Sequence, residues 1–491
     1  MHMGDEPATG YRERAVFIVR YSEVGIKGKR ARGMMEGKIR TNFLELLRRS
    51  GETAKITSSR GRIFISGFSD SGKVFSALSR TMGVKSFSAA TEIVYKSLGD
   101  IVIYCRDRFR DSVSGKKFAV RGRRNGGQGF TSMDLARAIG DSLFEYSGGV
   151  DLRNPDIEIN VEVRDNRAYI FSSVSPGPGG LPIGSEGRVA ALVSGGIDSP
   201  VAAWYLLKRG CMVDYVFISL AHPSDTLEFL KSIENILESW TSGYRPTINV
   251  IDGEKLVSEL LLKGKVRIPG ITYKRAMYEI ARRIALEKHG NAIVTGESVG
   301  QVSSQTPANL MAINSGFDFP VFRPLIGMDK DEITVIARRI GSFPRTTLGE
   351  LCSMFSQNVD LRADPEIVRE DFMKIEGLDQ LISHRKVLYP EDIPDTIKDL
   401  ESRSLLLATI PEKAVVVDLR TPLDFREWHY EGAKNIGISQ IPEFISGTDD
   451  SVSLVFYCSR GLQSAFAASS ARKLGRTAYY VPIDNLKSME K

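Results

Sequence analysis

The feature that most constrains the fold is a continuous apolar run, VAALV at residues 189–193, followed at once by SGGIDSP at 194–200. Such a run is typical of a β-strand that is buried on both faces, as in a parallel sheet. The apolar residues VAAWYLL at 201–207 then have helical character. Further apolar runs, MVDYVFISL at 212–220 and NAIVTGES at 291–298 among them, alternate with helical segments. This alternation predicts a doubly wound α/β domain with a parallel sheet.

The segment SGGIDSP carries the residue types that hold a phosphate at the start of a helix. Gly195 and Gly196 allow the backbone to come close to a ligand. Ser194, Ser199 and the free N–H groups of the helix start can bind pyrophosphate, and Asp198 can help to hold Mg²⁺. The spacing is not that of the GxxxxGK[ST] loop. The alternative is a glycine turn that joins strand and helix without a ligand.

The length and composition indicate several globular domains. A chain of 491 residues is too long for one ordinary core, so we expect roughly three or four domains. No stretch approaches the roughly 20 uninterrupted apolar residues of a membrane span, and the first ten residues lack the apolar core of a signal peptide. We therefore expect a cytoplasmic protein without membrane association.

Positive charge is concentrated in the N-terminal part of the chain. Residues 1–190 hold 31 Lys and Arg against 21 Asp and Glu, whereas residues 191–491 hold 35 against 39. This asymmetry indicates a polyanionic partner such as RNA, and solvated surface charge is the alternative. The predicted contacts, which would bind phosphates without reading sequence, are Lys116, Lys117, Arg121, Arg123, Arg124, Lys29 and Arg30.

The four cysteines, Cys105, Cys211, Cys352 and Cys458, include no CxxC pair. This excludes a disulfide framework and a zinc site of the usual spacing, and it favours a reduced cytoplasm. No residue set is singled out as a metal site. Cys458 ends the apolar run LVFYC and precedes a helical segment, so we expect it to react as a thiolate and to hold a persulfide sulfur. Cys105 and Cys211 lie among apolar residues and are interpreted as structural.

Longer segments resemble one family. GGLPIGSEGRVAALVSGGIDSPVAAWYLLKRGC, VTGESVGQVSSQTPANL and RPLIGMDKDEI are similar to the tRNA 4-thiouridine synthetases, and RYSEVGIKGK resembles their N-terminal signature. FAVRGRRNGGQGFTSMDLARAIG resembles the RNA-binding THUMP domain of that family. VVVDLR, HYEGAKNI and YCSRGLQS resemble a rhodanese domain. The segment SGGIDS is similar to the PP-loop of ATP pyrophosphatases, which form adenylates.

The resemblance implies an ATP-dependent tRNA sulfurtransferase that makes 4-thiouridine at position eight of tRNA. ATP with Mg²⁺ would adenylate the uridine C4 oxygen, with Asp198 and Lys330 carrying this chemistry. Cys458 would deliver persulfide sulfur, and Cys352 would then form a disulfide with Cys458. The other residues predicted to bind ATP are Ser194, Gly195, Gly196, Ser199, Thr295, Gly296, Glu297 and Arg275. An ordinary turn is the alternative for Thr295–Glu297, and helix packing is the alternative for Arg275.

The loop after Cys458 lacks an arginine at two informative positions. A phosphatase loop of the form Cys-x5-Arg would need arginine where this chain has Ser464. Many rhodaneses carry arginine where this chain has Gln463. The loop therefore argues against phosphatase activity and against free thiosulfate as a good sulfur donor.

The predicted fold is multidomain α/β and α+β, in four parts. They are a ferredoxin-like N-terminal domain at 1–75, a THUMP domain at 76–175, a doubly wound parallel-sheet PP-loop ATPase domain at 176–390 and a small α/β rhodanese domain at 391–491. The Gly- and Pro-rich segment 175–188 is predicted to be a linker, and the polar segment 376–404 is predicted to join the last two domains.

The resemblance also implies partners. They are tRNA, a cysteine desulfurase as sulfur donor and, if the chain also supplies sulfur for the thiamine thiazole, a ubiquitin-like sulfur carrier. A homodimer is left open. Two alternatives remain: a PP-loop amide ligase, which leaves the rhodanese-like segments unexplained, and a non-catalytic tRNA-binding sulfur carrier, which leaves the intact SGGIDS and DK motifs unexplained.

Overall fold

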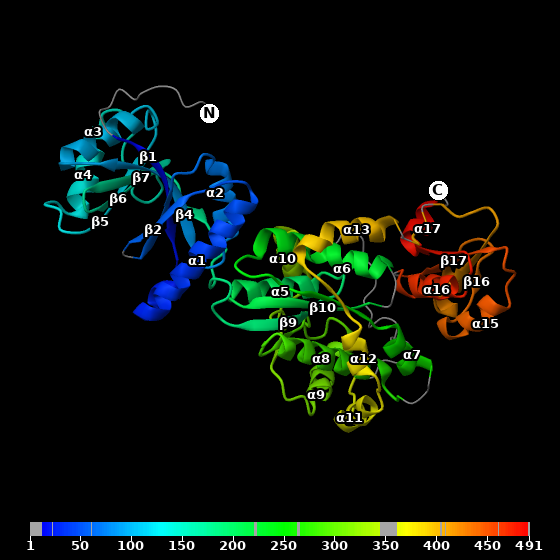
Figure 1. Cartoon of the computed structure of the whole chain (residues 1–491). Coiled ribbons are helices and arrows are strands. Elements are labelled where there is room, and N and C mark those ends of the chain that lie inside the picture. Colours follow the sequence, from blue (N-terminus) through cyan, green and yellow to red (C-terminus); the bar gives the residue numbers. More distant parts are fainter. Residues whose placement is uncertain are drawn as a thin grey trace. The chain divides into compact units, whose positions relative to one another are not determined.

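The computed structural model describes residues 12–21, 23–59, 61–219, 223–262, 266–343, 361–402, 405–407, 409–459 and 461–489. The chain divides into two compact units, Met1–Ile183 and Gly184–Lys491, each described here by itself (Figure 1). Among these described residues, no helix is both long enough and apolar enough to cross a membrane.

The first unit is built on one mixed sheet with the strand order β2-β3-β1-β4-β7-β6-β5, and β8 pairs with β4. The strands are β1 (Arg14–Arg20), β2 (Lys55–Ser59), β3 (Arg62–Ser66), β4 (Ser86–Val94), β5 (Phe118–Asn125), β6 (Ile157–Arg164), β7 (Arg167–Phe171) and β8 (Ser175–Pro176). The helices are η1 (Glu23–Ile26), α1 (Lys29–Arg49), α2 (Ser71–Leu78), α3 (Leu98–Phe109) and α4 (Ser132–Phe144). Only β5 and β6 pair in parallel among these described strands.

Helices α1 to α4 cover the same face of this sheet. Phe87 of β4 packs with α1 and α2, whereas Ile93 of β4 packs with α3 and α4. The two residues are an even number of positions apart in one strand, so their side chains point to the same face. On the opposite face, the rings of Phe64 and Tyr169 lie 4.8 Å apart and the Arg164 guanidinium covers Phe64. β4 belongs to both halves of the sheet, because it pairs with β1 on one side and with β7 on the other.

The structure places the first half of the predicted linker 175–188 in the first unit. β8 pairs with β4, and Gly179 exchanges two backbone hydrogen bonds of 2.8 Å with the loop before β4. Leu181 and Ile183 are buried. The free connection is therefore shorter than predicted, and the boundary between the two units falls between Ile183 and Gly184.

The second unit contains the predicted doubly wound domain. Its sheet has the order β13-β12-β9-β10-β11-β14 and is parallel except for the edge strand β14. The strands are β9 (Arg188–Leu192), β10 (Met212–Ser219), β11 (Ile248–Asp252), β12 (Ile293–Val294), β13 (Val321–Phe322) and β14 (Lys386–Leu388). The helices are α5 (Asp198–Lys208), α6 (Pro223–Asn235), α7 (Glu254–Leu262), α8 (Pro269–Glu287), α9 (Pro307–Asn314), α10 (Lys330–Ile340), α11 (Pro365–Met373), α12 (Leu378–Ser383) and α13 (Ile393–Ser402).

Helices cover both faces of this sheet, as the apolar run at 189–193 predicts. Ala190 and Leu192 point to a core shared with α8. The alternate residues Val189 and Ala191 are buried on the other face, where α5 packs against β9 and β10. The segment 376–404 is only partly a connection, because β14 pairs with β11 and α13 packs on α6. The connection to the last domain therefore begins after α13.

The C-terminal part of the second unit is a small α/β domain. Its sheet is all parallel, with the order β16-β15-β17-β18. The elements are β15 (Ala414–Asp418), α14 (Pro422–Glu427), β16 (Lys434–Asn435), α15 (Ile441–Ser446), β17 (Ser453–Cys458), α16 (Leu462–Lys473), β18 (Ala478–Pro482) and α17 (Ile483–Met489). Helix α16 packs on β17 and β18, and Trp428 and Leu486 belong to a second apolar cluster of this domain.

Candidate functional site

The glycine loop lies between the end of β9 and the start of α5, where open α/β sheets place their ligands. The backbone N–H of Ser194 donates to Ser199 Oγ at 2.8 Å, and the two hydroxyl oxygens are 3.1 Å apart. The N-cap residue of α5, Ile197, offers no side-chain cap, and the N–H groups of such a helix start are suited to bind an anion. A Cβ atom at Gly296 would lie 2.6 Å from the Ser199 backbone nitrogen. Glycine at this position therefore allows the turn Thr295–Glu297 to lie directly beside the loop.

Two motifs that are far apart in the sequence meet at Asp198. Lys330 Nζ donates to both Asp198 carboxylate oxygens at 2.9 Å, and Gln301 Nε2 donates to Oδ2 at 3.2 Å. Asp198 is buried, whereas the Lys330 side chain is half-exposed. Asp329 caps the helix that Lys330 begins, and this cap fixes the position of the lysine. The Asp198 carboxylate and the half-exposed Lys330 cation thus lie together at the glycine loop.

A buried charged network supports the turn Thr295–Glu297. The Glu297 carboxylate accepts from Tyr278 OH at 2.6 Å, Arg323 Nε at 2.8 Å and Thr295 Oγ1 at 3.0 Å. Lys274 Nζ lies 3.4 Å from the same carboxylate. Burial alone would raise the pKa of Glu297, but Lys274, Tyr278 and Arg323 outweigh it, and this pKa is below its ordinary value.

The structure separates two adjacent basic residues of α8. The guanidinium of Arg275, which the sequence predicts to bind ATP, lies 4.7 Å from the Phe317 ring and 4.6 Å from the Phe372 ring. Lys274, which begins the same predicted helix but was not among the residues predicted to bind ATP, instead reaches Glu297. Lys274 and Tyr278 are four residues apart on one helix face, and this spacing is the signal that could have indicated Lys274. The contact of Gln301 with Asp198 was also not predicted from the sequence. The only sequence signal for it is the position of Gln301 in the segment VTGESVGQVSSQTPANL.

We expect Glu297→Gln to lower the free energy of unfolding of the second unit by about 3 kcal/mol at pH 7, because Lys274 and Arg323 lose their buried counterion. The folded pKa of Glu297 is lowered, so its contribution is present above the unfolded value of about 4.3 and is lost as the pH falls through the folded pKa. Urea unfolding of parent and variant should therefore differ at pH 7 and converge as the pH falls through the lowered folded pKa of Glu297.

The control for this prediction is Glu366→Gln, which removes an exposed ion pair to Arg369. Its effect should stay below about 1 kcal/mol. The role of the buried network would be contradicted if Glu297→Gln lowered the free energy of unfolding by no more than Glu366→Gln does. It would also be contradicted if the decrease did not change with pH.

The second candidate centre is the cysteine at the end of β17. Cys458 is buried, with 3% of its surface exposed, and its Sγ lies 3.4 Å from Ser464 Oγ in the first turn of α16. Gly461 caps this helix with a φ of +79°, a conformation that favours glycine. Cys458 Sγ therefore lies beside the first turn of α16. Cys352 lies outside the described residues.

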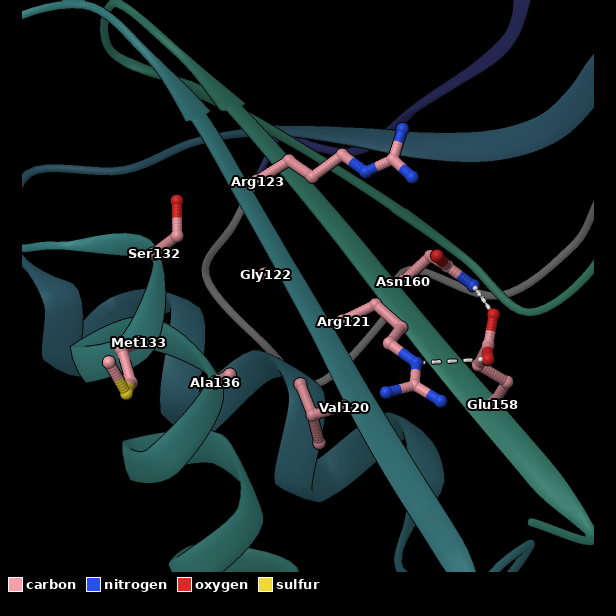
Figure 2. A pocket seen from close by; sticks show the side chains of 9 residues that line it. All are labelled: Val120, Arg121, Gly122, Arg123, Ser132, Met133, Ala136, Glu158 and Asn160. Carbon is pink, nitrogen blue, oxygen red and sulfur yellow. Dashed lines mark hydrogen bonds and ion pairs between the residues drawn. The ribbon is translucent and has the colours of Figure 1, made fainter. Parts of the chain in front are cut away.

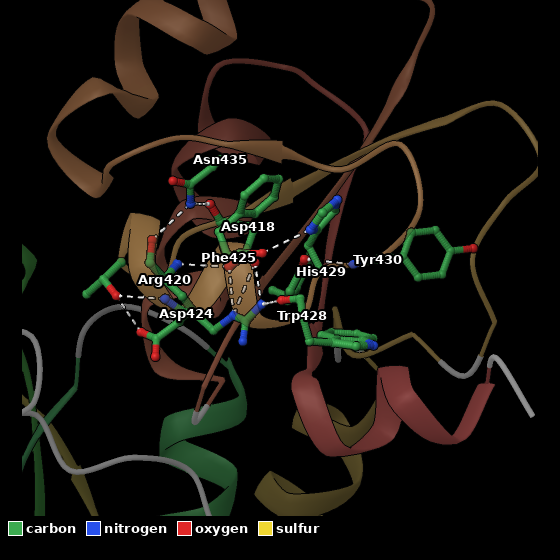
Figure 3. Close-up of polar contacts among 10 residues, drawn as sticks. Asp418, Arg420, Asp424, Phe425, Trp428, His429, Tyr430 and Asn435 are labelled. Atoms are coloured by element: carbon green, nitrogen blue, oxygen red, sulfur yellow. Dashed lines mark hydrogen bonds and ion pairs between the residues drawn. The ribbon is translucent and has the colours of Figure 1, made fainter.

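A buried ion pair holds the neighbouring strand β15. Arg420 Nη2 donates to Asp418 Oδ2 at 2.6 Å, and Arg420 also donates to the Trp428 carbonyl (Figure 3). Asn435 Nδ2 donates to the backbone oxygens of Asp418 and Arg420 at 3.1 and 2.9 Å. Asp418 pairs in the ladder with Tyr457, which precedes Cys458. This network therefore fixes the strand beside the cysteine.

The other two described cysteines fit a structural role. Both are buried and free of disulfides. Burial raises the pKa of Cys211 to about 11 and raises that of Cys105 further. Neither thiol is therefore ionised near neutral pH.

The predicted RNA contacts are distributed over two elements of the first unit. Lys29 and Arg30 begin α1, and Lys116, Lys117, Arg121, Arg123 and Arg124 lie in or just before β5. All are exposed except Arg121, which is half-buried.

A pocket of about 530 Å³ lies where β5 meets the start of α4 (Figure 2). Arg121 and Arg123 extend to one side of β5, and Ser132 and Met133 lie on the other. Arg121 Nε donates to Glu158 at 3.1 Å, and Glu158 also accepts from Asn160 at 3.1 Å. The pocket combines basic and polar groups, as RNA-binding surfaces do.

Comparisons with protein families agree with this architecture. The model of the thiamine biosynthesis protein ThiI matches residues 184–376, the ThiI ferredoxin-like domain matches 16–88, the THUMP domain matches 95–173 and the rhodanese-like domain matches 402–482. The fold and the sites thus define a multidomain enzyme with a PP-loop ATPase domain, a THUMP domain and a rhodanese domain.

Relatives cover nearly the whole chain. The tRNA sulfurtransferase of Thermoplasma acidophilum is 40% identical over 96% of this chain and 96% of its own. That of Pyrobaculum aerophilum is 37% identical over 94% of this chain and 96% of its own. A crystal structure of a 4-thiouridine synthetase–RNA complex with bound ATP is similar with a TM-score of 0.67 and 30% identity, covering 77% of this chain and 99% of that one. The chain belongs to the tRNA sulfurtransferase family. The predicted family, fold class and enzyme class are confirmed.

Proposed function

We propose that this enzyme makes 4-thiouridine at position eight of tRNA in two chemical stages. In the first, the uridine O4 attacks the α-phosphorus of ATP, and pyrophosphate leaves. In the second, the terminal sulfur of a Cys458 persulfide attacks C4, and AMP leaves with the former O4. Adenylation is needed because the oxygen of an amide-like carbonyl is a poor leaving group. The ATP and RNA bound in the similar 4-thiouridine synthetase support both substrates.

The observation that carries the proposal is the contact of Lys330 with both oxygens of Asp198 at the glycine loop. In the presence of a nucleotide, the half-exposed Lys330 can move to the phosphates and offset the charge that develops during transfer. Ser194, Gly195, Gly196 and Ser199 would hold pyrophosphate. Thr295, Gly296 and Glu297 would border the nucleotide, and we retain Arg275 only as a prediction.

Magnesium is part of the proposal through Asp198. The described residues contain no group of three or more His, Cys, Asp or Glu side chains that could hold a metal ion. Mg²⁺ usually binds with one or two carboxylates together with substrate phosphates and water. Asp198 therefore fits a magnesium–nucleotide complex. When bound, Mg²⁺ would neutralise phosphate charge.

The sulfur path uses two thiols. After sulfur transfer, Cys458 remains linked to the base through a disulfide bond. The Cys352 thiolate would attack Cys458 Sγ, which releases the 4-thiouridine sulfur and forms a Cys352–Cys458 disulfide. A dithiol reductant would then restore both thiols. We propose a cysteine desulfurase as the donor of persulfide sulfur.

Sulfur supply to a ubiquitin-like carrier for the thiamine thiazole is a second proposed role, which the match to a thiamine biosynthesis protein supports.

The reaction is tested by incubating tRNA with the full chain, ATP, Mg²⁺ and a persulfide donor, followed by mass analysis of the nucleosides. We expect 4-thiouridine that depends on both ATP and the donor. A protein that takes up sulfur and binds tRNA but neither exchanges pyrophosphate into ATP nor makes 4-thiouridine would be a non-catalytic sulfur carrier. That outcome would contradict the proposal.

RNA binding is expected to depend on the first unit. A chain that starts at Gly184 should fold, because its cores lie within the second unit, but it should lose tight tRNA binding together with the basic residues of α1 and β5. Binding by the full chain should weaken about a hundredfold or more between 50 and 200 mM salt, since phosphate contacts release counterions. The truncated chain should still take up sulfur at Cys458, which serves as the control. Undiminished tRNA affinity after truncation would contradict the assignment.

A further inference from the structure

The hydroxyl of Ser464 is a buried polar group in contact with the sulfur of Cys458. Its Oγ lies 3.4 Å from Cys458 Sγ and donates to the carbonyl oxygen of Gly461 at 3.0 Å. Ser464 is completely buried, so solvent does not offer its hydroxyl another partner. It lies in the first turn of α16, on a helix that packs against β17 and β18.

This position suits a hydroxyl that changes partners. A serine hydroxyl has one proton to donate and two lone pairs that accept, and the proton turns to suit its surroundings. While Cys458 is a thiol, its S–H can donate to Ser464 Oγ and the serine proton can stay on Gly461. When Cys458 Sγ is negatively charged, it can only accept a hydrogen bond. Rotation of the hydroxyl then brings a donor to the charged sulfur without any movement of the backbone.

We propose that Ser464 is a hydrogen-bond switch for Cys458, turning its proton from the Gly461 carbonyl to the sulfur each time Sγ becomes an anion. The inference rests on the proposed role of Cys458 as the persulfide carrier. It applies to sulfur uptake, in which the Cys458 thiolate attacks the outer sulfur of the donor's persulfide. The donor's S–S bond breaks, the donor leaves as a thiolate and the new S–S bond forms on Cys458. It applies again when the dithiol reductant expels Cys458 as a thiolate from its disulfide with Cys352.

The same geometry explains how Cys458 can be stabilised without an arginine at position 463 or 464. Gln463 and Ser464 occupy the positions where related loops carry a guanidinium, which binds oxyanions in two places at once. A single hydroxyl in contact with one sulfur atom cannot bind an oxyanion in this bidentate way. The site therefore stabilises a sulfur anion on the protein and does not select an oxyanion as its substrate.

The test compares Ser464→Ala with Ser469→Ala in the full chain carrying Cys352→Ser, so that Cys458 is the thiol monitored by peptide mapping. Ser469 lies on the same helix, farther from the sulfur. Alanine removes one buried atom and favours the helix, and thermal unfolding is measured first to verify folding. The readouts are the rate of alkylation by iodoacetamide as a function of pH and the rate of persulfide uptake from a desulfurase.

We expect Ser464→Ala to shift the alkylation profile upward by about one pH unit and to slow persulfide uptake at neutral pH about tenfold, since a charge-assisted hydrogen bond is lost. Ser469→Ala should leave the alkylation profile and the rate of persulfide uptake unchanged. Pyrophosphate exchange into ATP should be unchanged in Ser464→Ala as well. Ser464→Thr keeps the hydroxyl, so its rate of persulfide uptake should stay within about threefold of the parent. An unshifted pH profile in Ser464→Ala, or an equal loss in Ser464→Thr, would overturn the switch. Sulfur uptake that persists in Cys458→Ser would instead overturn the proposed function itself.

Discussion

We expect Cys458→Ser to take up no sulfur from the desulfurase and to make no 4-thiouridine, with adenylation of tRNA unchanged. Serine is close to cysteine in shape but cannot form a persulfide. Cys458 ends a buried strand beside the first turn of α16, whereas Cys105 and Cys211 are buried thiols with raised pKa values. Mass analysis of the protein after exposure to the donor measures the uptake directly.

The matched variant is Cys352→Ser. It should take up sulfur normally but stop after a single turnover or fail in release, because the bond between Cys458 and the base has no thiol to open it. In the parent protein, peptide mapping after one turnover without reductant should find a Cys352–Cys458 disulfide. That bond requires the two Cα atoms to come within about 7 Å. Full multiple-turnover activity in Cys352→Ser would contradict this pathway and would indicate release of free bisulfide near the base.

Asp198→Ala and Lys330→Ala should each lower tRNA adenylation by at least about a hundredfold, the usual effect of removing a preorganised group that stabilises developing charge. Both variants should still load sulfur on Cys458, because the cysteine belongs to a separate sheet. The rate is measured as pyrophosphate exchange and as AMP release in the presence of tRNA.

The control for these two variants is Asp331→Asn, one residue beyond Lys330 and exposed at the same helix start. Its adenylation rate should lie within about threefold of the parent, as expected for an exposed charge. If Lys330→Ala adenylates as fast as this control, the lysine has no part in the chemistry and its contact with Asp198 is only structural.

Local signals were enough to predict the strand, loop and helix order at Asp198 and at Cys458. The loop at Asp198 follows from an apolar strand, two glycines and a helix within a dozen residues, and Cys458 follows from a buried strand that ends at a helix start. The structure places both as the sequence predicts. Their chemical roles stay predictions until the variants are measured.

Long-range contacts account for what the sequence did not reveal. Either Lys274 or Arg275 could have faced the site, and the choice depends on how α8 is rotated against Glu297 on one side and Phe317 on the other. The glycines and prolines after residue 175 read as a flexible linker, but buried Leu181 and Ile183 hold that segment in place. The strand β14 has only three residues, and its pairing with β11 is not evident from its own sequence.

The strand β4 has a mechanical consequence for the whole first unit. The ferredoxin-like match ends at residue 88 and the THUMP match begins at residue 95, so β4 (Ser86–Val94) spans the border between them. Its backbone hydrogen bonds to β1 and β7 join the two modules into one continuous sheet. Most neighbouring domains are instead joined by a flexible linker. The two modules can therefore neither bend nor turn against each other without breaking a sheet. If residues of both modules bind the same RNA, the distance between their phosphate contacts is therefore set by the sheet.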